Sequence, residues 1–223
     1  MQKKMTSILF TGIIALSLAA CGAPEGGKEA AAGANESGTP SAEQADVPYK
    51  TLFQKSVFLG DSITEGLSYH DVLDEAHVIG NAGATAEYSQ DEVDNLASKH
   101  PDDVFILLGG CDLYMPVDDP KEYFLTQYAK LIGKIKGKLP KAKIRVLSLT
   151  PVTAAAEQEE PRYRNIAEFN AGLKELAAKE QVEWIDLAPI FADNPDLFDT
   201  DGIHFKPEFY PLWLDYLKEY LKS

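Results

Sequence analysis

The sequence predicts an α/β fold in which a parallel β-sheet carries helices on both faces. Short apolar runs alternate with longer segments of helical spacing, as in chains built from repeated strand–helix units. Most of the apolar runs are continuous in hydrophobicity, which is typical of strands that are covered on both faces. This alternation occupies residues 49–223, a length that suits one domain.

Five segments are expected to form strands, and four are expected to form helices. The strands are predicted at 57–59, 76–79, 104–108, 144–149 and 182–187. The last of them alternates apolar and polar residues, so we expect it to lie nearer an edge of the sheet. The helices are predicted at 91–99, 120–139, 164–179 and 207–222, and the aromatic residues of the last helix have the spacing of core packing.

The first 48 residues differ from the rest of the chain. Lys3 and Lys4 precede an apolar stretch over 8–20 that is too short to span a membrane comfortably. The stretch ends in Leu-Ala-Ala-Cys, which resembles a bacterial lipobox. That resemblance implies that residues 1–20 are a lipoprotein signal peptide and that Cys21 is lipidated. An ordinary secretory signal or an uncleaved anchor helix is the alternative.

Residues 21–48 are dominated by Ala, Gly, Ser, Glu and Pro, a composition that predicts a flexible tether. The remainder, residues 49–223, is expected to be the folded domain. If the lipobox interpretation holds, the protein is extracytoplasmic and is attached to the bacterial cell membrane through its lipid anchor only.

The charge and the cysteine count exclude several kinds of partner. There are 21 basic and 35 acidic residues, a net charge of −14, which argues against nucleic acid and against anionic lipid surfaces. With Cys21 taken by lipid, Cys111 has no partner for an internal disulfide. The four histidines form no cluster with cysteine at ligand spacing, so we predict no metal site and no cofactor. We expect a monomer.

Four polar motifs follow predicted strands. Gly60-Asp61-Ser62 follows the first, Asn81-Ala82-Gly83 the second and Gly109-Gly110-Cys111-Asp112 the third, while Asp201-Gly202-Ile203-His204 separates the final strand from the last helix. Because ligands bind at the carboxyl ends of parallel strands, we expect these motifs to share one rim of the sheet. Serine, histidine and aspartate are the groups that acyl transfer through a serine requires. Taken alone, Gly-Asp-Ser is more typical of a turn with a helix N-cap than of a catalytic serine.

Together the motifs resemble the four blocks of the SGNH, or GDSL, hydrolases: Gly-Asp-Ser, a glycine, Gly-x-Asn-Asp and Asp-x-x-His. The resemblance extends from Ser56 to the terminal helix. It implies a flavodoxin-like three-layer α/β/α sandwich with a parallel sheet of about five strands. It also implies a serine esterase that removes an acetyl or short acyl group from a small-molecule or glycan ester at the cell envelope.

The resemblance assigns roles to individual residues. Ser62 would be the nucleophile, His204 its general base, and Asp201 the group that orients the imidazole. The backbone N–H groups of Ser62 and Gly83 would face the developing oxyanion. The third block departs from the family, because its asparagine position holds Cys111, and a thiol is a weak hydrogen-bond donor.

The cysteine leaves three alternatives open. Cys111 would itself be a nucleophile if it were a thiolate beside His204. The protein would be a binding lipoprotein on a hydrolase scaffold if the substitution had cost it efficient catalysis. An O-acyltransferase would use the same three residues with an acceptor other than water.

Weaker expectations concern other residues near this rim. Asp61, Tyr114 and Tyr163 are expected to contact substrate, and Tyr114 and Met115 are candidates for the wall of an acyl pocket. The connection over 150–164 either contacts substrate or is a solvated loop. The substrate itself is not specified by the sequence, because one fold and one triad serve many esters.

Overall fold

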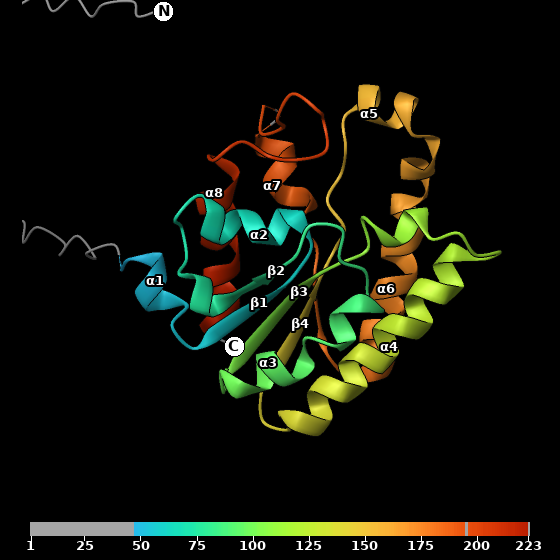
Figure 1. The fold of residues 1–223 in the computed structure, drawn as a ribbon. Helices are drawn as coiled ribbons and strands as arrows, with labels where there is room; N and C mark the ends of the chain where they lie inside the picture. The colour runs from blue at the N-terminus through green and yellow to red at the C-terminus, as the bar shows by residue number, and fades with distance from the viewer. Residues whose placement is uncertain (1–46, 195, 223) are drawn as a thin grey trace, which may run out of the picture. The chain divides into compact units, whose positions relative to one another are not determined.

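The computed structural model describes residues 47–194 and 196–222, which contain a five-stranded parallel sheet of order β2-β1-β3-β4-β5 (Figure 1). The strands are β1 (Ser56–Gly60), β2 (Val78–Gly80), β3 (Asp103–Leu107), β4 (Lys143–Leu147) and β5 (Glu183–Ile185). All four strand pairs are parallel. The predicted signal peptide, the lipidation site Cys21 and nearly all of the predicted tether lie outside the described residues.

The predicted strands are confirmed, with small changes at their ends. β5 is an edge strand, as its alternating pattern indicates, and β2 forms the other edge. Leu108, Leu149 and Leu187 were expected within strands, but they lie beyond the strand ends and belong to the buried core clusters. Because core positions beyond a strand end are also apolar, the predicted strands were too long.

The four predicted helices correspond to α3 (Val93–Ser98), α4 (Pro120–Lys138), α6 (Ile166–Glu180) and α8 (Phe209–Leu217), the last continued by the 3-10 turn η5 (Lys218–Lys222). The sequence did not predict α1 (Tyr49–Leu52), α2 (Ser62–Tyr69), α5 (Ala154–Glu159) and α7 (Ala188–Asp193). Each has at most eight residues. That is about two turns, too few to establish a helical period.

Short 3-10 turns fill several connections: η1 (Glu75–His77), η2 (Tyr88–Gln90), η3 (Asp112–Tyr114) and η4 (Pro161–Asn165). The connection over 150–164, predicted as a loop, holds both α5 and most of η4. Thr153 caps α5 by accepting a hydrogen bond from the Ala156 N–H. This segment therefore has a structure of its own where it passes the carboxyl end of β4.

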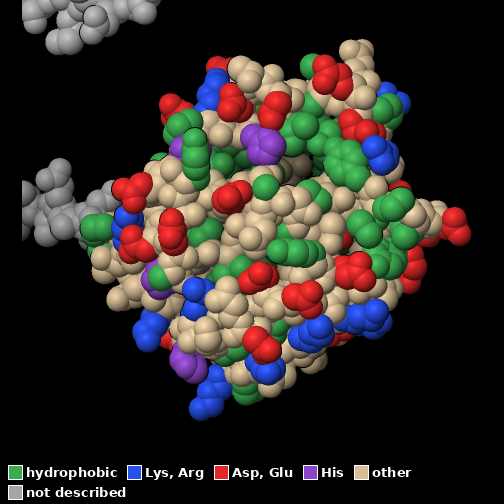
Figure 2. Space-filling view, viewed as in Figure 1, with side chains coloured by type: hydrophobic (Ala, Val, Ile, Leu, Met, Phe, Trp, Pro, Cys, Tyr) green, Lys and Arg blue, Asp and Glu red, His purple; other side chains and the backbone are tan. Residues whose placement is uncertain are grey.

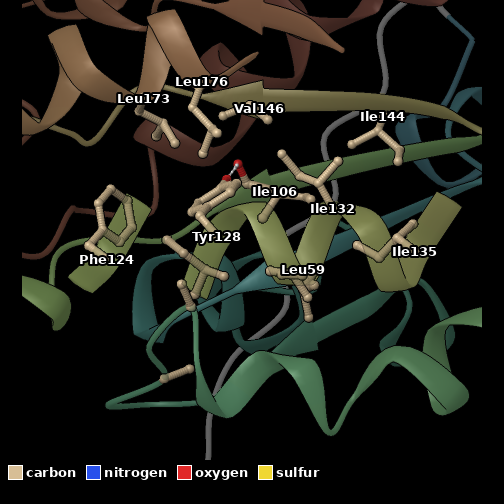
Figure 3. Packing of buried hydrophobic residues seen from close by; sticks show 14 of the residues in the cluster. Leu59, Ile106, Phe124, Tyr128, Ile132, Ile135, Ile144, Val146, Leu173 and Leu176 are labelled. Carbon is tan, nitrogen blue, oxygen red and sulfur yellow. Dashed lines mark hydrogen bonds between the residues drawn. The ribbon is translucent and has the colours of Figure 1, made fainter. Parts of the chain in front are cut away.

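Helices cover both faces of the sheet, which confirms the three-layer α/β/α arrangement. On one face α3, α4 and α6 pack against alternate strand residues such as Val57, Ile106 and Val146. Figure 3 shows α4 residues packed against the sheet, with the hydroxyl of Tyr128 donating a hydrogen bond to the Ile106 carbonyl at 3.3 Å. The intervening strand residues face the other layer, which period-two alternation requires.

The second layer consists of α1, α2, α7 and α8, which bury Phe58, Phe105 and Leu147 of the strands. Trp213 of α8 is fully buried among these rings, and its ring centroid lies 6.0 Å from that of Phe58. The prediction that the aromatic residues of the last helix serve core packing is confirmed. No helix in the described part of the chain is long and apolar enough to cross a membrane.

One charged side chain is completely buried in the sheet. Arg145 of β4 forms ion pairs with Asp103 and Glu183 on the neighbouring strands, and it donates to the Tyr220 carbonyl at 2.6 Å. Its guanidinium carbon lies 5.2 Å from the centroid of the Phe105 ring. These contacts compensate the buried charge and attach the C-terminal turn to the sheet.

Candidate active site

The first part of the site is the sharp turn from β1 into α2. Every residue of β1 is buried, and Asp61 follows it as the N-cap of α2, its carboxylate accepting a hydrogen bond from the Ile63 N–H at 3.0 Å. A Cβ on Gly60 would lie 2.4 Å from the Leu107 carbonyl oxygen of β3, so the turn requires glycine. Ser62 is the first residue of α2, which leaves its N–H without a carbonyl acceptor inside the helix.

The second part is the loop between α7 and α8, which carries Asp201 and His204. One carboxylate oxygen of Asp201 accepts the N–H groups of Ile203 and His204, each at 2.9 Å. The other oxygen lies 2.6 Å from Nδ1 of His204. Gly202 adopts a φ of 70°, and a Cβ there would lie 2.1 Å from the Thr153 hydroxyl. The Asp201 carboxylate thus holds the loop through hydrogen bonds within it, and Gly202 packs the loop against the segment after β4.

The two parts meet through one hydrogen bond. Oγ of Ser62 lies 2.9 Å from Nε2 of His204, although the two residues are 142 positions apart in the chain. Asp201, as an acceptor at Nδ1, favours the tautomer with the proton on Nδ1. Nε2 is then free to accept the serine hydroxyl proton. The structure therefore brings Ser62, His204 and Asp201 into one hydrogen-bonded chain, as the sequence predicts.

The carboxylate of Asp201 is suited to remain charged beside the imidazole. Burial alone would raise the pKa of Asp201. The hydrogen bonds from the His204 side chain and from two backbone N–H groups outweigh that effect and hold the pKa below its usual value. A carboxylate that stays ionised can stabilise an imidazolium ion.

Gly83 and Cys111, both expected to take part in an oxyanion hole, lie close to each other. Gly83 has a φ of 81°, a left-handed conformation that favours glycine. Burial, followed by the nearby charges of Asp61 and Asp112, raises the pKa of the Cys111 thiol to about 11. Cys111 is therefore a neutral thiol at physiological pH.

Asp61 and Asp112 are buried carboxyl groups beside these donors. Asp61 is 4% exposed, and burial raises its pKa to about 6 despite the hydrogen bond from the Ile63 N–H. Asp61 was expected to contact substrate; the structure places it in the cavity wall and gives its carboxylate the helix-capping bond.

Sequence reasoning assigned no role to Asp112. Its two carboxylate oxygens accept the Ala86 N–H at 3.1 and 3.2 Å, which ties η3 to the loop that carries Gly83. Asp112 is 1% exposed, and burial raises its pKa to about 7. In the sequence, Asp112 is the acidic residue that ends the third motif, Gly109-Gly110-Cys111-Asp112. Its partner Ala86 lies 26 positions away, so no local pattern indicates the contact.

A cavity of about 160 Å³ opens beside Ser62 and His204. Tyr114 and Tyr163, both predicted to contact substrate, line it, and their rings pack edge to face with centroids 5.6 Å apart. Thr150 and Val152 from the segment after β4 also line it, whereas Met115 is not among the described residues of its wall. Figure 2 shows this side of the molecule, with a hollow beside a histidine and hydrophobic side chains around it.

Within the described residues, no group of three or more His, Cys, Asp or Glu side chains is placed to hold a metal ion. The site is therefore described by its own side chains and backbone groups.

The sequence pattern of the GDSL-like lipase/acylhydrolase family matches residues 58–212 of this chain. The chain belongs to this family. The matched residues run from β1 into α8 and include all four motifs at the rim. A sequence comparison with curated proteins finds no match.

Solved structures of similar fold include the following three proteins. A GDSL-like lipase from Bacteroides thetaiotaomicron has a TM-score of 0.61 and 18% identity, over 75% of this chain and 87% of the other. A putative platelet activating factor protein from Streptococcus pneumoniae has a TM-score of 0.59 and 24% identity, over 78% and 89%. An acetyl xylan esterase has a TM-score of 0.57 and 19% identity, over 74% and 98%. At these identities the likeness concerns the fold.

The buried carboxyl of Asp112 predicts a pH-dependent effect of Asp112→Asn on stability. Because the pKa of Asp112 is about 7 in the folded protein against 3.8 for a free carboxyl, its contribution to stability is largest below pH 4 and is lost as the pH rises to 7. Relative to the wild type, Asp112→Asn should gain roughly 2–4 kcal/mol in unfolding free energy between pH 4 and pH 8.

Chemical denaturation of both proteins across this pH range measures the difference. Asp118→Asn, at an exposed position before α4, is the matched control and should show little change. If the difference in unfolding free energy between Asp112→Asn and wild type does not vary with pH, Asp112 is not a buried carboxyl with a raised pKa.

Proposed function

We propose that the protein is a serine ester hydrolase that uses Ser62, His204 and Asp201 to remove an O-acyl group. The supporting observation is the hydrogen-bonded chain from the Ser62 hydroxyl through both ring nitrogens of His204 to Asp201, with distances of 2.9 and 2.6 Å. Membership of the GDSL-like lipase/acylhydrolase family supports ester hydrolysis as the reaction class.

In the proposed reaction, Oγ of Ser62 attacks the ester carbonyl while Nε2 of His204 takes the hydroxyl proton. Asp201 stabilises the resulting imidazolium through Nδ1–H. The tetrahedral intermediate collapses, the C–O bond to the alcohol breaks, and His204 returns its proton to the departing oxygen. A water molecule, deprotonated by His204, then attacks the acyl-serine and releases the carboxylic acid and free Ser62.

The negative charge of the tetrahedral intermediate would be met by backbone donors. The N–H of Ser62 at the start of α2 and the N–H of Gly83 are the two candidates. Asp61 and Asp112 anchor the segments that carry them, through the Ile63 and Ala86 N–H groups respectively. Cys111 lies beside Gly83, at the position where the family pattern has an amide donor.

Cys111 as the nucleophile is disfavoured by its chemistry. A thiolate is required for attack, and a thiol whose pKa is raised to about 11 is almost entirely protonated at neutral pH. Ser62, by contrast, already bonds the general base.

A second candidate function is a binding protein that has lost efficient catalysis. The observation that favours it is Cys111, which stands where the family pattern has an amide donor. Removing one oxyanion donor typically costs about 10²–10³ in turnover. Two backbone donors remain in the proposed site, so we place a slow esterase ahead of an inactive scaffold.

We further propose that the enzyme acts outside the cytoplasm as a monomer attached by a lipid on Cys21, with residues 21–48 as its tether. The proposal rests on the basic pair Lys3 and Lys4, the apolar stretch that follows and the Leu-Ala-Ala-Cys ending. The acidic net charge favours small neutral or glycan esters over anionic partners.

Ser62→Ala should abolish turnover, because no other group in the proposed mechanism attacks the carbonyl. Esterase activity on p-nitrophenyl butyrate should fall by roughly 10⁴-fold or more, and labelling by a fluorophosphonate probe should disappear. Ser68→Ala, on the same helix, removes a hydroxyl that bonds only its own turn and should keep both signals. Labelling that survives in Ser62→Ala and is lost in Cys111→Ala would contradict the nucleophile assignment.

Cys111→Asn should raise turnover, because it restores an amide N–H beside the oxyanion position. We expect a gain of about tenfold or more in kcat on simple esters, given what one such donor is normally worth. Asn is only slightly larger than Cys, so the substitution should fit.

Cys111→Ala is the matched control, since it removes the sulfur without adding a donor. An equal gain in both variants would mean that the thiol obstructs the Gly83 N–H and that the amide adds nothing. The absence of any turnover or probe labelling in wild type and both variants would favour the binding protein.

A further inference from the structure

The cavity beside Ser62 is apolar and built from the protein core. Most of its wall is aliphatic or aromatic, and Leu108, Leu113, Leu149 and Tyr163 in that wall also belong to the core cluster under α4 and α6. Side chains that are fixed by core packing do not need to rearrange to admit a ligand. The cavity is therefore formed before a substrate binds.

The tyrosines of the wall are held in place by their neighbours. The Tyr114 ring packs edge to face on the Tyr163 ring, with centroids 5.6 Å apart. Outside them, the Arg162 guanidinium lies 4.6 Å from the centroid of the Tyr114 ring, and two of its nitrogens donate to the carboxylate of Glu160 at 2.8 and 2.6 Å. These contacts fix the two rings, which form part of a mostly apolar wall. An apolar wall of this kind suits a hydrocarbon group.

The volume sets the size of that group. About 160 Å³ is close to the roughly 150 Å³ of an apolar cavity that admits benzene, a molecule of six carbons. An acetyl group would occupy only the part next to Ser62. We propose that this cavity binds the acyl chain of the substrate and that the preferred chain has about six carbons. The inference rests on the hydrolase function proposed above and narrows it to medium-chain acyl esters.

The alcohol part of the ester fits less well in this cavity. It departs with the proton of His204, whose side chain is 45% exposed, so the departing oxygen would lie toward solvent. The acyl part stays bonded to Ser62 through the second half of the reaction and must be held on the protein side. The polar alcohol then projects from the mouth, where its identity is little restricted.

Acyl-chain selectivity tests the inference. With one leaving group, p-nitrophenol, kcat/KM is measured for straight chains of two, four, six, eight and ten carbons. Each methylene moved from water into an apolar site is worth about fourfold. We expect kcat/KM to rise by at least about tenfold from the acetyl to the hexanoyl ester, and to rise no further beyond eight carbons. A series that is flat or best with acetyl would overturn the proposal.

A second series separates the acyl chain from the alcohol. Acetate esters of straight alcohols with two to eight carbons are hydrolysed under pH-stat titration. We expect kcat/KM to vary little along this series. A steep rise with alcohol length, together with a flat acyl series, would place the leaving group in the cavity and overturn the inference.

Filling the cavity should change the selectivity. Val152 is half-buried and lines the wall, so Val152→Phe should lower the hexanoyl-to-acetyl ratio of kcat/KM by about tenfold or more. Val117→Phe, at an exposed position outside the wall, is the matched control and should leave the ratio unchanged. Circular dichroism checks the fold; if Val152→Phe does not fold, Ile166→Phe at the half-buried start of α6 replaces it.

The outcomes separate the two proposals. Hydrolysis of the esters without chain-length selectivity, or an unchanged ratio in a folded cavity-filling variant, overturns the acyl pocket and leaves the hydrolase standing. If no ester is hydrolysed and the fluorophosphonate probe does not label the wild type, the hydrolase function fails, and the acyl pocket fails with it.

Discussion

The hydrogen bond between Ser62 and His204 is the contact on which the site depends, and the parallel sheet makes it possible. The two residues are 142 positions apart, so only the fold brings them together. Because all five strands run the same way, the turn after β1 and the loop before α8 reach the same rim. Two glycines allow the backbone packing that this contact needs. Gly60 lies against the Leu107 carbonyl and Gly202 against Thr153, where a Cβ would clash.

The same rim buries two carboxyl groups, whose negative charge would oppose the formation of an oxyanion nearby. Asp61 and Asp112 lie near the position where an oxyanion would form, and burial raises the pKa of both. Each carboxylate nevertheless anchors a segment that carries a proposed donor, through the Ile63 and Ala86 N–H groups. Cys111, a neutral thiol, lies close to both acids. Strained or costly groups of this kind are found most often at functional sites.

Much of this arrangement was predictable from the sequence because it depends on hydrophobic periodicity over whole strands and helices and on motifs at strand ends. The five strands and the helices α3, α4, α6 and α8 follow from hydrophobic periodicity, and the positions of Ser62, Asp201 and His204 follow from motifs at strand ends. The helices α1, α2, α5 and α7 were missed, because at most eight residues show too few turns to establish a period. Helix α3 is as short, but it was predicted as part of a longer segment over 91–99. Arg145 is completely buried in a strand expected to be apolar, because its partners Asp103 and Glu183 come from neighbouring strands and cannot be read locally.

Features that depend on three-dimensional packing could not be predicted from the sequence. Asp112 binds Ala86, 26 positions away, and no local pattern indicates that contact. The apolar cavity is assembled from the ends of β3 and β4, the start of α6 and the loop of His204, so neither its volume nor its polarity is a property of any one segment. Tyr114 and Tyr163 were singled out separately, but their edge-to-face contact appears only in the fold.

A double-mutant cycle on Asp201 and His204 tests most directly whether these residues act with Ser62 as one unit. The values of kcat/KM for p-nitrophenyl butyrate are compared among wild type, Asp201→Ala, His204→Ala and the double variant. If the chain of hydrogen bonds carries the reaction, the two single variants lose similar, large factors. The kcat/KM of the double variant is then no more than about tenfold below that of the less active single variant. Losses that multiply would show two independent contributions and would contradict the triad.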